Sequence, residues 1–210
     1  LQSNANIWVA TKVTSGLTYL YRSSAVRLVR DNNTGRIWAI YTKYDSVTGQ
    51  YQVFDSYSDD KGQTWVEEKV TSYANGSYKA AVVIDEEGNL HCTSPNKYGG
   101  PGALYYRKRT SSGWQADELV SNSAIEESSI ALDSQGNIHV TWSQGHIHYR
   151  KKGSSGWETD THIYSDGYVQ SYPTIAVDLD DHIHIIWIGG SAGGNDTVRH
   201  IAVSYTHLTL

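Results

Sequence analysis

Hydrophobic and polar residues alternate along most of this chain in short runs, which is the pattern of half-buried β-strands. Four segments share one arrangement: a short apolar run, a turn that begins with Asp, and a second run in which every other residue is apolar. These segments begin at Arg27, Ala81, Ser129 and Thr174. No stretch of about 11 or more residues keeps the 3.6-residue period of an amphipathic helix. The pattern therefore predicts an all-β chain in which one hairpin occurs four times.

The spacing of these hairpins indicates how they are assembled. Their leading acids are Asp31, Asp85, Asp133 and Asp178, which lie 54, 48 and 45 residues apart. This period is typical of propeller blades and too long for leucine-rich or ankyrin repeats. A third strand follows each of the first three hairpins, and then a Gly-containing turn leads to a tryptophan, at Trp65, Trp114 and Trp157. We therefore predict a β-propeller whose blades each have four antiparallel strands.

The repeats set the expected blade boundaries at 22-71, 72-122, 123-168 and 169-204, with residues 1-21 as the last strand of another blade. Methionine is absent and the first residue is Leu1, which favours four blades of a six- or seven-bladed propeller. The alternative is a four-bladed ring closed by residues 5–16. The predicted propeller spans 1-204. The tail, 205-210, lacks the Gly and Trp expected there, so we interpret it as a truncated reading frame or a non-native ending.

Composition excludes several classes of function. Charged residues make up 19% of the chain, the net charge is -5, and no run of like charges occurs, so we expect no nucleic-acid partner. No apolar run approaches the roughly 20 residues that span a bilayer. Cys92 is the single cysteine, which excludes an intramolecular disulfide and a cysteine-based zinc site. The 16 Tyr and 7 Trp against one Phe favour a secreted, glycan-handling protein, extracellular or at the cell surface. The oligomeric state stays open.

The octapeptide "SDDKGQTW" fits the pattern S-x-D-x-G-x-T-W between the third and fourth strands of the first predicted blade. It resembles the Asp-box, or BNR repeat, of the sialidase superfamily. Asp suits backbone N–H groups across a turn, Gly tolerates a positive φ, and the hydroxyls bond the local backbone. We therefore predict a structural role, and the resemblance implies a position opposite the substrate site. The five motif residues are Ser58, Asp60, Gly62, Thr64 and Trp65.

The same resemblance implies a catalytic site. Sialidases use three arginines that bind the substrate carboxylate, an aspartate acid/base, and a tyrosine nucleophile paired with a glutamate. Arg22, in "YRSSAV", stands where the first arginine is expected, although serines replace the family's Ile and Pro. Asp45 stands near the expected acid, and Lys43 near a second pocket arginine, without the bidentate fork of arginine. The resemblance thus implies a sialidase-type exo-glycosidase with Arg22 and Asp45 as catalytic residues. The alternative is a non-catalytic propeller module that binds glycan or protein.

Ligand contacts are expected on the face that carries the turns between second and third strands. Lys97 and Tyr98 flank a Gly-Gly-Pro-Gly turn on that face and are predicted to bind ligand. Tyr44 and Trp142 are predicted platforms on which a sugar ring stacks, as is Tyr98, although a tyrosine beside such a loop is more often half-buried. We predict a glycan or glycoconjugate as the partner and no cofactor.

Histidine pairs raise the question of a metal. His146 and His148, and again His182 and His184, are spaced i and i+2, so each pair lies on one face of a strand. However, His91, His139 and His184 share one slot of the repeat, which Trp38 fills in the first unit, and this favours a packing or hydrogen-bonding role. The acids of "DLDD", Asp178, Asp180 and Asp181, occupy the same turn as the other leading acids. We therefore expect no metal site.

Overall fold

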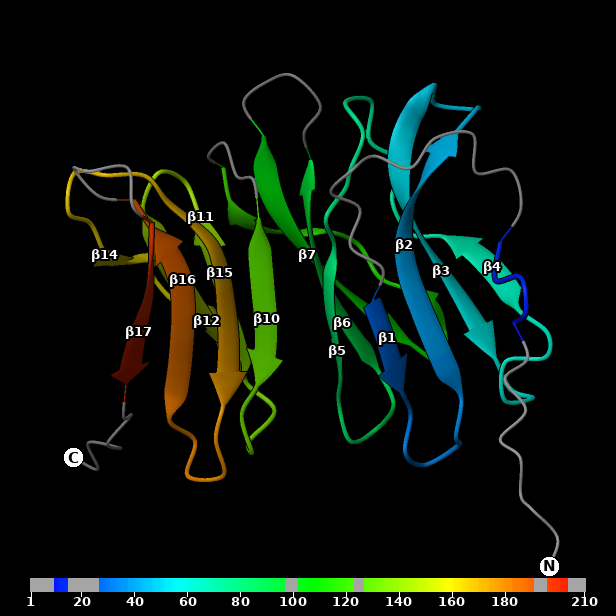
Figure 1. The fold of residues 1–210 in the computed structure, drawn as a ribbon. Helices are drawn as coiled ribbons and strands as arrows, with labels where there is room; N and C mark the ends of the chain where they lie inside the picture. The colour runs from blue at the N-terminus through cyan, green and yellow to red at the C-terminus, as the bar shows by residue number, and fades with distance from the viewer. Residues whose placement is uncertain (1–9, 15–26, 97–101, 123–126, 191–195, 204–210) are drawn as a thin grey trace, which may run out of the picture.

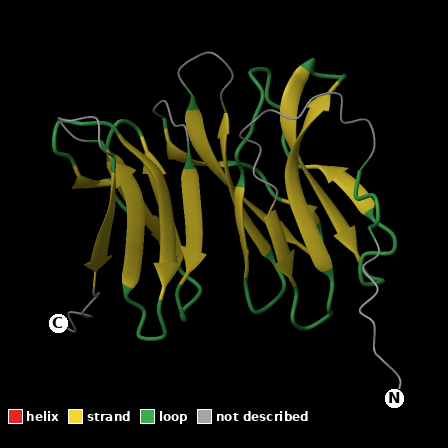
Figure 2. Cartoon of the chain, in the orientation of Figure 1, coloured by secondary structure: helices red, strands yellow, loops and turns green. Residues whose placement is uncertain are grey.

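The computed structural model describes residues 10–14, 27–96, 102–122, 127–190 and 196–203. The predicted residues Arg22, Lys97 and Tyr98 and the tail 205–210 lie outside them. Every regular element in this part of the chain is a strand (Figure 2). No membrane-crossing helix occurs among the described residues. The strands are β1 (Arg27–Arg30), β2 (Ile37–Asp45), β3 (Gln50–Ser58), β4 (Val66–Lys69), β5 (Ala81–Ile84), β6 (Leu90–Asn96), β7 (Ala103–Thr110), β8 (Gly113–Trp114), β9 (Glu118–Ser121), β10 (Ser128–Leu132), β11 (Ile138–Ser143), β12 (Ile147–Gly153), β13 (Gly156–Trp157), β14 (Thr161–Tyr164), β15 (Gln170–Val177), β16 (Ile183–Gly189) and β17 (Thr197–Val203).

Consecutive strands pair into four antiparallel sheets, each formed by one continuous part of the chain. The first sheet is β1-β2-β3-β4, and the fourth is β15-β16-β17 in the described residues. In the second and third sheets the fourth strand is divided in two: β8 and β9 both pair with β7, and β13 and β14 both pair with β12. The prediction of an all-β chain with propeller-type sheets is therefore confirmed. Each sheet lies inside one of the predicted blade ranges.

The first strands of the four sheets form the inner row of an arc. β1 contacts β5, β5 contacts β10, and β10 contacts β15. Figure 1 shows these four strands side by side, with the later strands of each sheet further from them. This is the arrangement of blades around a propeller axis.

The core lies between the sheets, because each sheet places apolar side chains on both faces. Three clusters fill the three junctions between consecutive sheets. Val53, Leu104 and Ile147 occupy the same place in successive sheets, and each is fully buried. Burying one such side chain contributes about 1.5–3 kcal/mol. The repeated apolar position is therefore what holds one sheet against the next.

The tryptophans that follow the third strand also join neighbouring sheets. Trp114 packs in the cluster between the first and second sheets, and Trp157 in the cluster between the second and third. Their indole Nε1 atoms donate hydrogen bonds to the preceding sheet, Trp114 to Asp55 at 2.9 Å and Trp157 to Glu118 at 3.0 Å. Trp65 packs on the opposite face of the first sheet, against a cluster that Val13 also contacts.

The octapeptide forms a tight turn between β3 and β4. The Ser58 hydroxyl donates to Asp60 Oδ1 at 2.8 Å and accepts the Gly62 amide at 2.7 Å. Asp60 accepts the amide and the hydroxyl of Thr64 at 2.8 and 2.6 Å, and Trp65 Nε1 donates to the Gly62 carbonyl at 3.1 Å. The hydrogen bonds from Thr64 and Ser58 lower the pKa of Asp60 to about 2. Each of the five motif residues therefore makes a hydrogen bond to another residue of the same turn.

Histidine in the shared slot of the repeat is hydrogen-bonded at both nitrogens. His91 pairs through Nε2 with Asp85 at 2.9 Å and through Nδ1 with the Tyr106 hydroxyl at 2.8 Å. His139 repeats the arrangement with Asp133 and Tyr149, at 3.1 and 2.6 Å. Burial lowers the pKa of both histidines more than their carboxylate partners raise it. These rings link the turn to the third strand inside each sheet.

Candidate functional site

The sheets have two ends, and strand order decides which turns lie at each. The turns that begin with the leading acids join first to second strands, and the octapeptide joins third to fourth, so both lie at one end, at the bottom of Figure 1. The β2–β3 turn and the starts of β5, β10 and β15 lie at the other end, which we call the loop face. The β2–β3 turn beside the predicted residues Tyr44 and Asp45 therefore belongs to the loop face.

Asp45 ends β2 on the loop face, and its buried carboxylate closes the turn to β3. Oδ2 accepts the Thr48 hydroxyl at 2.8 Å and the Lys69 ammonium at 3.0 Å, and Oδ1 accepts the Val47 amide at 3.4 Å. Burial would raise the pKa of Asp45, but the hydrogen bonds from Lys69 and Thr48 outweigh it and lower the pKa. A general acid must carry a proton at working pH. The acid role of Asp45 stays a prediction that this geometry does not favour.

Lys43 and Tyr44 differ in how accessible they are. Lys43 Nζ donates to Glu67 Oε1 at 2.6 Å and lies 5.1 Å from the ring centre of Phe54, so its charge is already paired. Tyr44 is 39% exposed, and its ring meets Tyr51 edge-on at 5.6 Å. Of the two, Tyr44 offers the freer ring edge to a ligand, and its ligand-binding role stays a prediction.

Trp142 lies in β11 and is fully buried. Its indole packs in the cluster between the second and third sheets and stacks on the ring of His148 at 5.3 Å. Its Nε1 has no hydrogen-bond partner among the described residues. A sugar can stack on this ring only if its protein neighbours move, so the structure gives Trp142 a packing position. Its role as a stacking platform stays a prediction.

Three residues that the sequence interpretation did not single out share one position on the loop face. Lys79, Glu127 and Tyr172 each lie six residues before a leading acid, within two residues of the start of an inner strand. Lys79 and Tyr172 have φ values of 54° and 55°, which are rare for residues with a side chain. At Tyr172 the pairing of β15 with β16 also shifts register. Counting back from the turn acids of the repeat would have identified this position.

The side chains at this position are polar or aromatic, and two of them have groups that the described residues leave unbound or uncovered: one carboxylate oxygen of Glu127 accepts no hydrogen bond, and more than half of Tyr172 is exposed. Lys79 Nζ donates to Glu127 Oε1 at 2.5 Å, which joins the second and third sheets. The second oxygen, Glu127 Oε2, is buried and has no hydrogen-bond partner among the residues that the structure describes. Tyr172 is 59% exposed. Strained backbone often accompanies a functional site because the fold must hold it against its preference.

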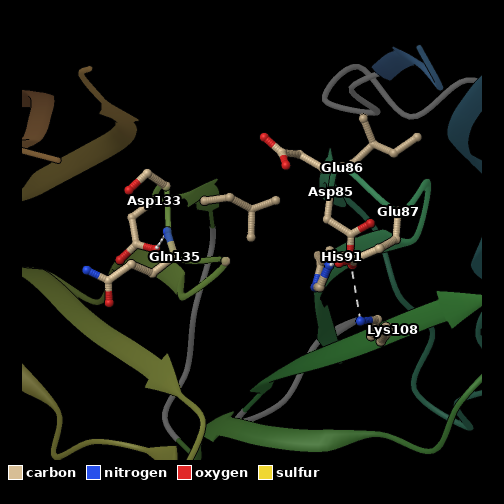
Figure 3. Close-up of a pocket in the computed structure, with 11 residues that line it drawn as sticks. Asp85, Glu86, Glu87, His91, Lys108, Asp133 and Gln135 are labelled. Carbon is tan, nitrogen blue, oxygen red and sulfur yellow. Dashed lines mark hydrogen bonds and ion pairs between the residues drawn. The ribbon is translucent and has the colours of Figure 1, made fainter. Parts of the chain in front are cut away.

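A cavity of about 480 Å³ opens at the other end of the sheets, between the turns after Asp85 and Asp133 (Figure 3). Asp85, Glu87, His91 and Lys108 line one side, and Asp133 lines the other. The Asp85 carboxylate already pairs with His91 and with Lys108, the latter at 3.5 Å. Because these charges are paired within the protein, the cavity does not by itself define a ligand.

Solved structures share this fold. The chain matches the Hadza microbial sialidase Hz136 with a TM-score of 0.60, 15% identity, and coverage of 84% of this chain and 43% of the sialidase. It matches the α-L-arabinofuranosidase Arb93A of Fusarium graminearum with a TM-score of 0.68, 13% identity, and coverage of 90% and 64%. It also matches a PL25 ulvan lyase, with a TM-score of 0.64, 11% identity, and coverage of 92% and 58%.

These similarities establish a fold found in carbohydrate-active propellers. The sequence matches no protein-family model and no curated protein. The chain spans 43% of the sialidase and 64% of the arabinofuranosidase, so it corresponds to part of each.

Proposed function

We propose that this chain is part of a carbohydrate-active β-propeller that binds glycan on the loop face. The observation that carries the proposal is the shared position of Lys79, Glu127 and Tyr172 at the starts of three inner strands. The fold supports it, because the similar structures include a sialidase, an α-L-arabinofuranosidase and an ulvan lyase.

The three side chains suit a sugar. A tyrosine ring presents an apolar face to the C–H groups of a pyranose or furanose. When the side chains over it move aside, the buried Glu127 Oε2 accepts a hydroxyl hydrogen, which removes the cost of an unpaired buried oxygen. Lys79 holds Glu127 Oε1 and can donate a further hydrogen bond to a ring or hydroxyl oxygen of the sugar.

The finer proposal is a sialidase-type glycoside hydrolase that acts outside the cell. The octapeptide resembles an Asp-box, its turn lies at the end opposite the loop face, and a sialidase is among the similar structures. In this proposal Arg22 binds the substrate carboxylate and Asp45 is the acid/base.

A non-catalytic glycan-binding module is the second candidate, and one observation favours it. The Asp45 carboxylate is engaged by Thr48 and Lys69, and its pKa is lowered, so at neutral pH it has no proton to give. A module of this kind binds the same glycans without turnover.

Calorimetric titration of the chain with sialyllactose and with arabino-oligosaccharides tests the binding proposal. We expect Glu127→Gln and Tyr172→Ala each to weaken binding by about tenfold, since a sugar contact of this kind contributes about 1.4 kcal/mol. Glu87→Gln, at the opposite end of the sheets, is the matched control and should leave the affinity unchanged. An affinity that neither loop-face variant alters would refute the loop-face site.

Fluorogenic sialosides and arabinofuranosides then separate the two candidates. Turnover that Asp45→Asn abolishes in a folded protein supports the hydrolase. Glycan binding without turnover supports the module.

A further inference from the structure

Two histidine side chains contact one carboxylate in the fourth sheet, and a third histidine contacts one of them. His182 Nδ1 lies 3.0 Å from Asp178 Oδ2, and His184 Nε2 lies 3.1 Å from the same oxygen. The second nitrogen of His184 lies 3.2 Å from His200 Nε2, and these two rings stack at 5.4 Å. Asp178, His182 and His184 remain more than a third exposed, so solutes reach them.

The corresponding carboxylates of other sheets have different neighbours. In the second sheet Asp85 Oδ2 accepts the side-chain amide of Asn89 at 2.9 Å and lies 3.5 Å from the Lys108 ammonium. The third sheet repeats this set with Asp133, Asn137 and Lys151. A lysine therefore balances the carboxylate in both sheets.

The fourth sheet replaces each of these groups. His182 stands four residues after the leading acid, where the second and third sheets have asparagine. Ala202 pairs with His184 in the register where lysine pairs with His91 and His139, so the balancing ammonium is absent from this place. His200 stands where the second and third sheets have the tyrosine that bonds the shared histidine. All three changes favour a metal cation, since two add imidazole and one removes a competing positive charge.

We propose that Asp178, His182 and His184 bind Zn²⁺ or a similar divalent transition metal. Two imidazoles and a carboxylate are ligands that Zn²⁺ prefers, and ligands about 2.0–2.1 Å from a tetrahedral ion lie roughly 3.3 Å apart. The distances of 3.0 and 3.1 Å from Asp178 Oδ2 are near that spacing. The ligand atoms of His184 lie outside the group within 4.8 Å that Asp178 and His182 form in the described residues, so the exposed His184 ring must rotate toward His182 for both to reach one ion.

Neighbouring groups complete the site. Ligand atoms of Asp178, Asp180 and His182 all lie within 4.8 Å of one another, so Asp180 is placed to bind the same ion as Asp178 and His182, and His184 joins them through its contact with Asp178 Oδ2. His200 acts on the second nitrogen of His184 and positions that ring, as outer hydrogen bonds do at zinc sites. The proposal departs from the sequence expectation of no metal, which treated the "DLDD" acids only as turn formers.

The site lies at the end of the sheets opposite the loop face, so it does not depend on the proposed glycan function. A bound ion would tie the β15–β16 turn to β16 and, through His200, to β17. Ligation to the folded state alone raises the free energy of unfolding.

Titration of the chain, purified without a histidine tag, with Zn²⁺ against a chelating dye tests the proposal. We expect one equivalent with a dissociation constant below about 100 µM at pH 7.5. His182→Asn restores the residue of the second and third sheets, so it should fold, and we expect it to weaken binding at least about tenfold. His162→Asn removes an exposed histidine from the third sheet and should leave the affinity unchanged.

Two further measurements define the ligands. Co²⁺ bound at this site should give the visible absorption of a tetrahedral ion, and Ala202→Lys should weaken binding by returning the ammonium. Absence of binding at 100 µM Zn²⁺, or equal affinity in wild type and His182→Asn, would overturn the proposal. Loss of binding in His162→Asn instead would also overturn it, because the ion would then sit in the third sheet.

Discussion

The indole Nε1 of Trp114 donates a hydrogen bond of 2.9 Å to Oδ2 of Asp55, across the junction between the first and second sheets. Asp55 is completely buried, and its Oδ1 has no partner among the described residues. Arg109 Nε lies 3.6 Å from Oδ2, beyond hydrogen-bond distance. This carboxylate therefore depends on Trp114 for its close side-chain donor.

Trp114→Phe should destabilise the protein by about 1–3 kcal/mol, because it leaves a buried carboxylate oxygen without its donor. Trp157→Phe is the matched comparison. Its acceptor, Glu118, is 40% exposed and also accepts Lys152 at 2.5 Å, so we expect a smaller loss there. Urea unfolding followed by fluorescence measures both. A larger loss in Trp157→Phe would show that the hydrogen bond to Asp55 is not the decisive contact.

Stability should depend on pH through Asp55. Burial raises its pKa to about 7 from an ordinary value of 3.8, against the opposing effects of Trp114 and Arg109. Between these two values the folded protein holds a proton that the unfolded chain has lost, so stability falls as the pH rises from about 4 to about 7. Asp55→Asn cannot ionise and should lose this dependence.

The measurement is the free energy of unfolding of wild type and Asp55→Asn between pH 4 and pH 8. Titration of His91 and His139 is common to both proteins and cancels in the difference. As the pH rises, the free energy of unfolding of wild type should fall relative to that of Asp55→Asn, and the difference between them should become constant above about pH 7. A difference that is flat across this range would contradict the raised pKa.

Adjacent residues of the octapeptide turn should respond to substitution in opposite directions. Gly62 has a φ of 87° and Lys61 a φ of 60°. Gly62→Ala should destabilise the protein by about 1–2 kcal/mol, because a Cβ disfavours this conformation. Lys61→Gly should be neutral or stabilising for the same reason. Thermal unfolding of the two variants checks this, and a stable Gly62→Ala protein would show that the turn does not need glycine.

Asp45→Asn should cost about 1–3 kcal/mol at pH 7, since the ionised carboxylate accepts Lys69 and Thr48. Its lowered pKa means that this stabilisation is present above about pH 4 and is lost as the pH falls through the folded-state pKa. Acid titration of stability in wild type and variant measures the effect. Lys69→Met, which removes the ammonium, should share part of the loss. Unchanged stability in Asp45→Asn would argue that this carboxylate is kept for another role.

Much of the fold follows from local sequence. Asp85 and Asp133 recur with Gly and Asn at fixed distances because each turn satisfies its own backbone, and a turn of this kind forms from neighbours in the chain. The apolar alternation on either side then identifies the strands. The repeat period identifies the propeller without any tertiary information.

The candidate site was less accessible to sequence reasoning. Trp142 and Tyr44 are both aromatic residues near a loop, yet one is fully buried and the other is 39% exposed. Asp45 has the residue type of an acid catalyst, yet its environment lowers its pKa. Exposure and proton affinity depend on groups distant in sequence, such as Lys69.

The sequence by itself determined the strands, the Asp-led turns and the number of hairpins, because these depend on contacts within a few residues. Tertiary structure alone decided that Lys79 and Glu127 meet across two sheets, that Asp55 is buried beneath Trp114, and that His184 joins Asp178 to His200. Each of these contacts joins separate strands or sheets. Their register and packing, rather than any local preference, set the distance between the side chains.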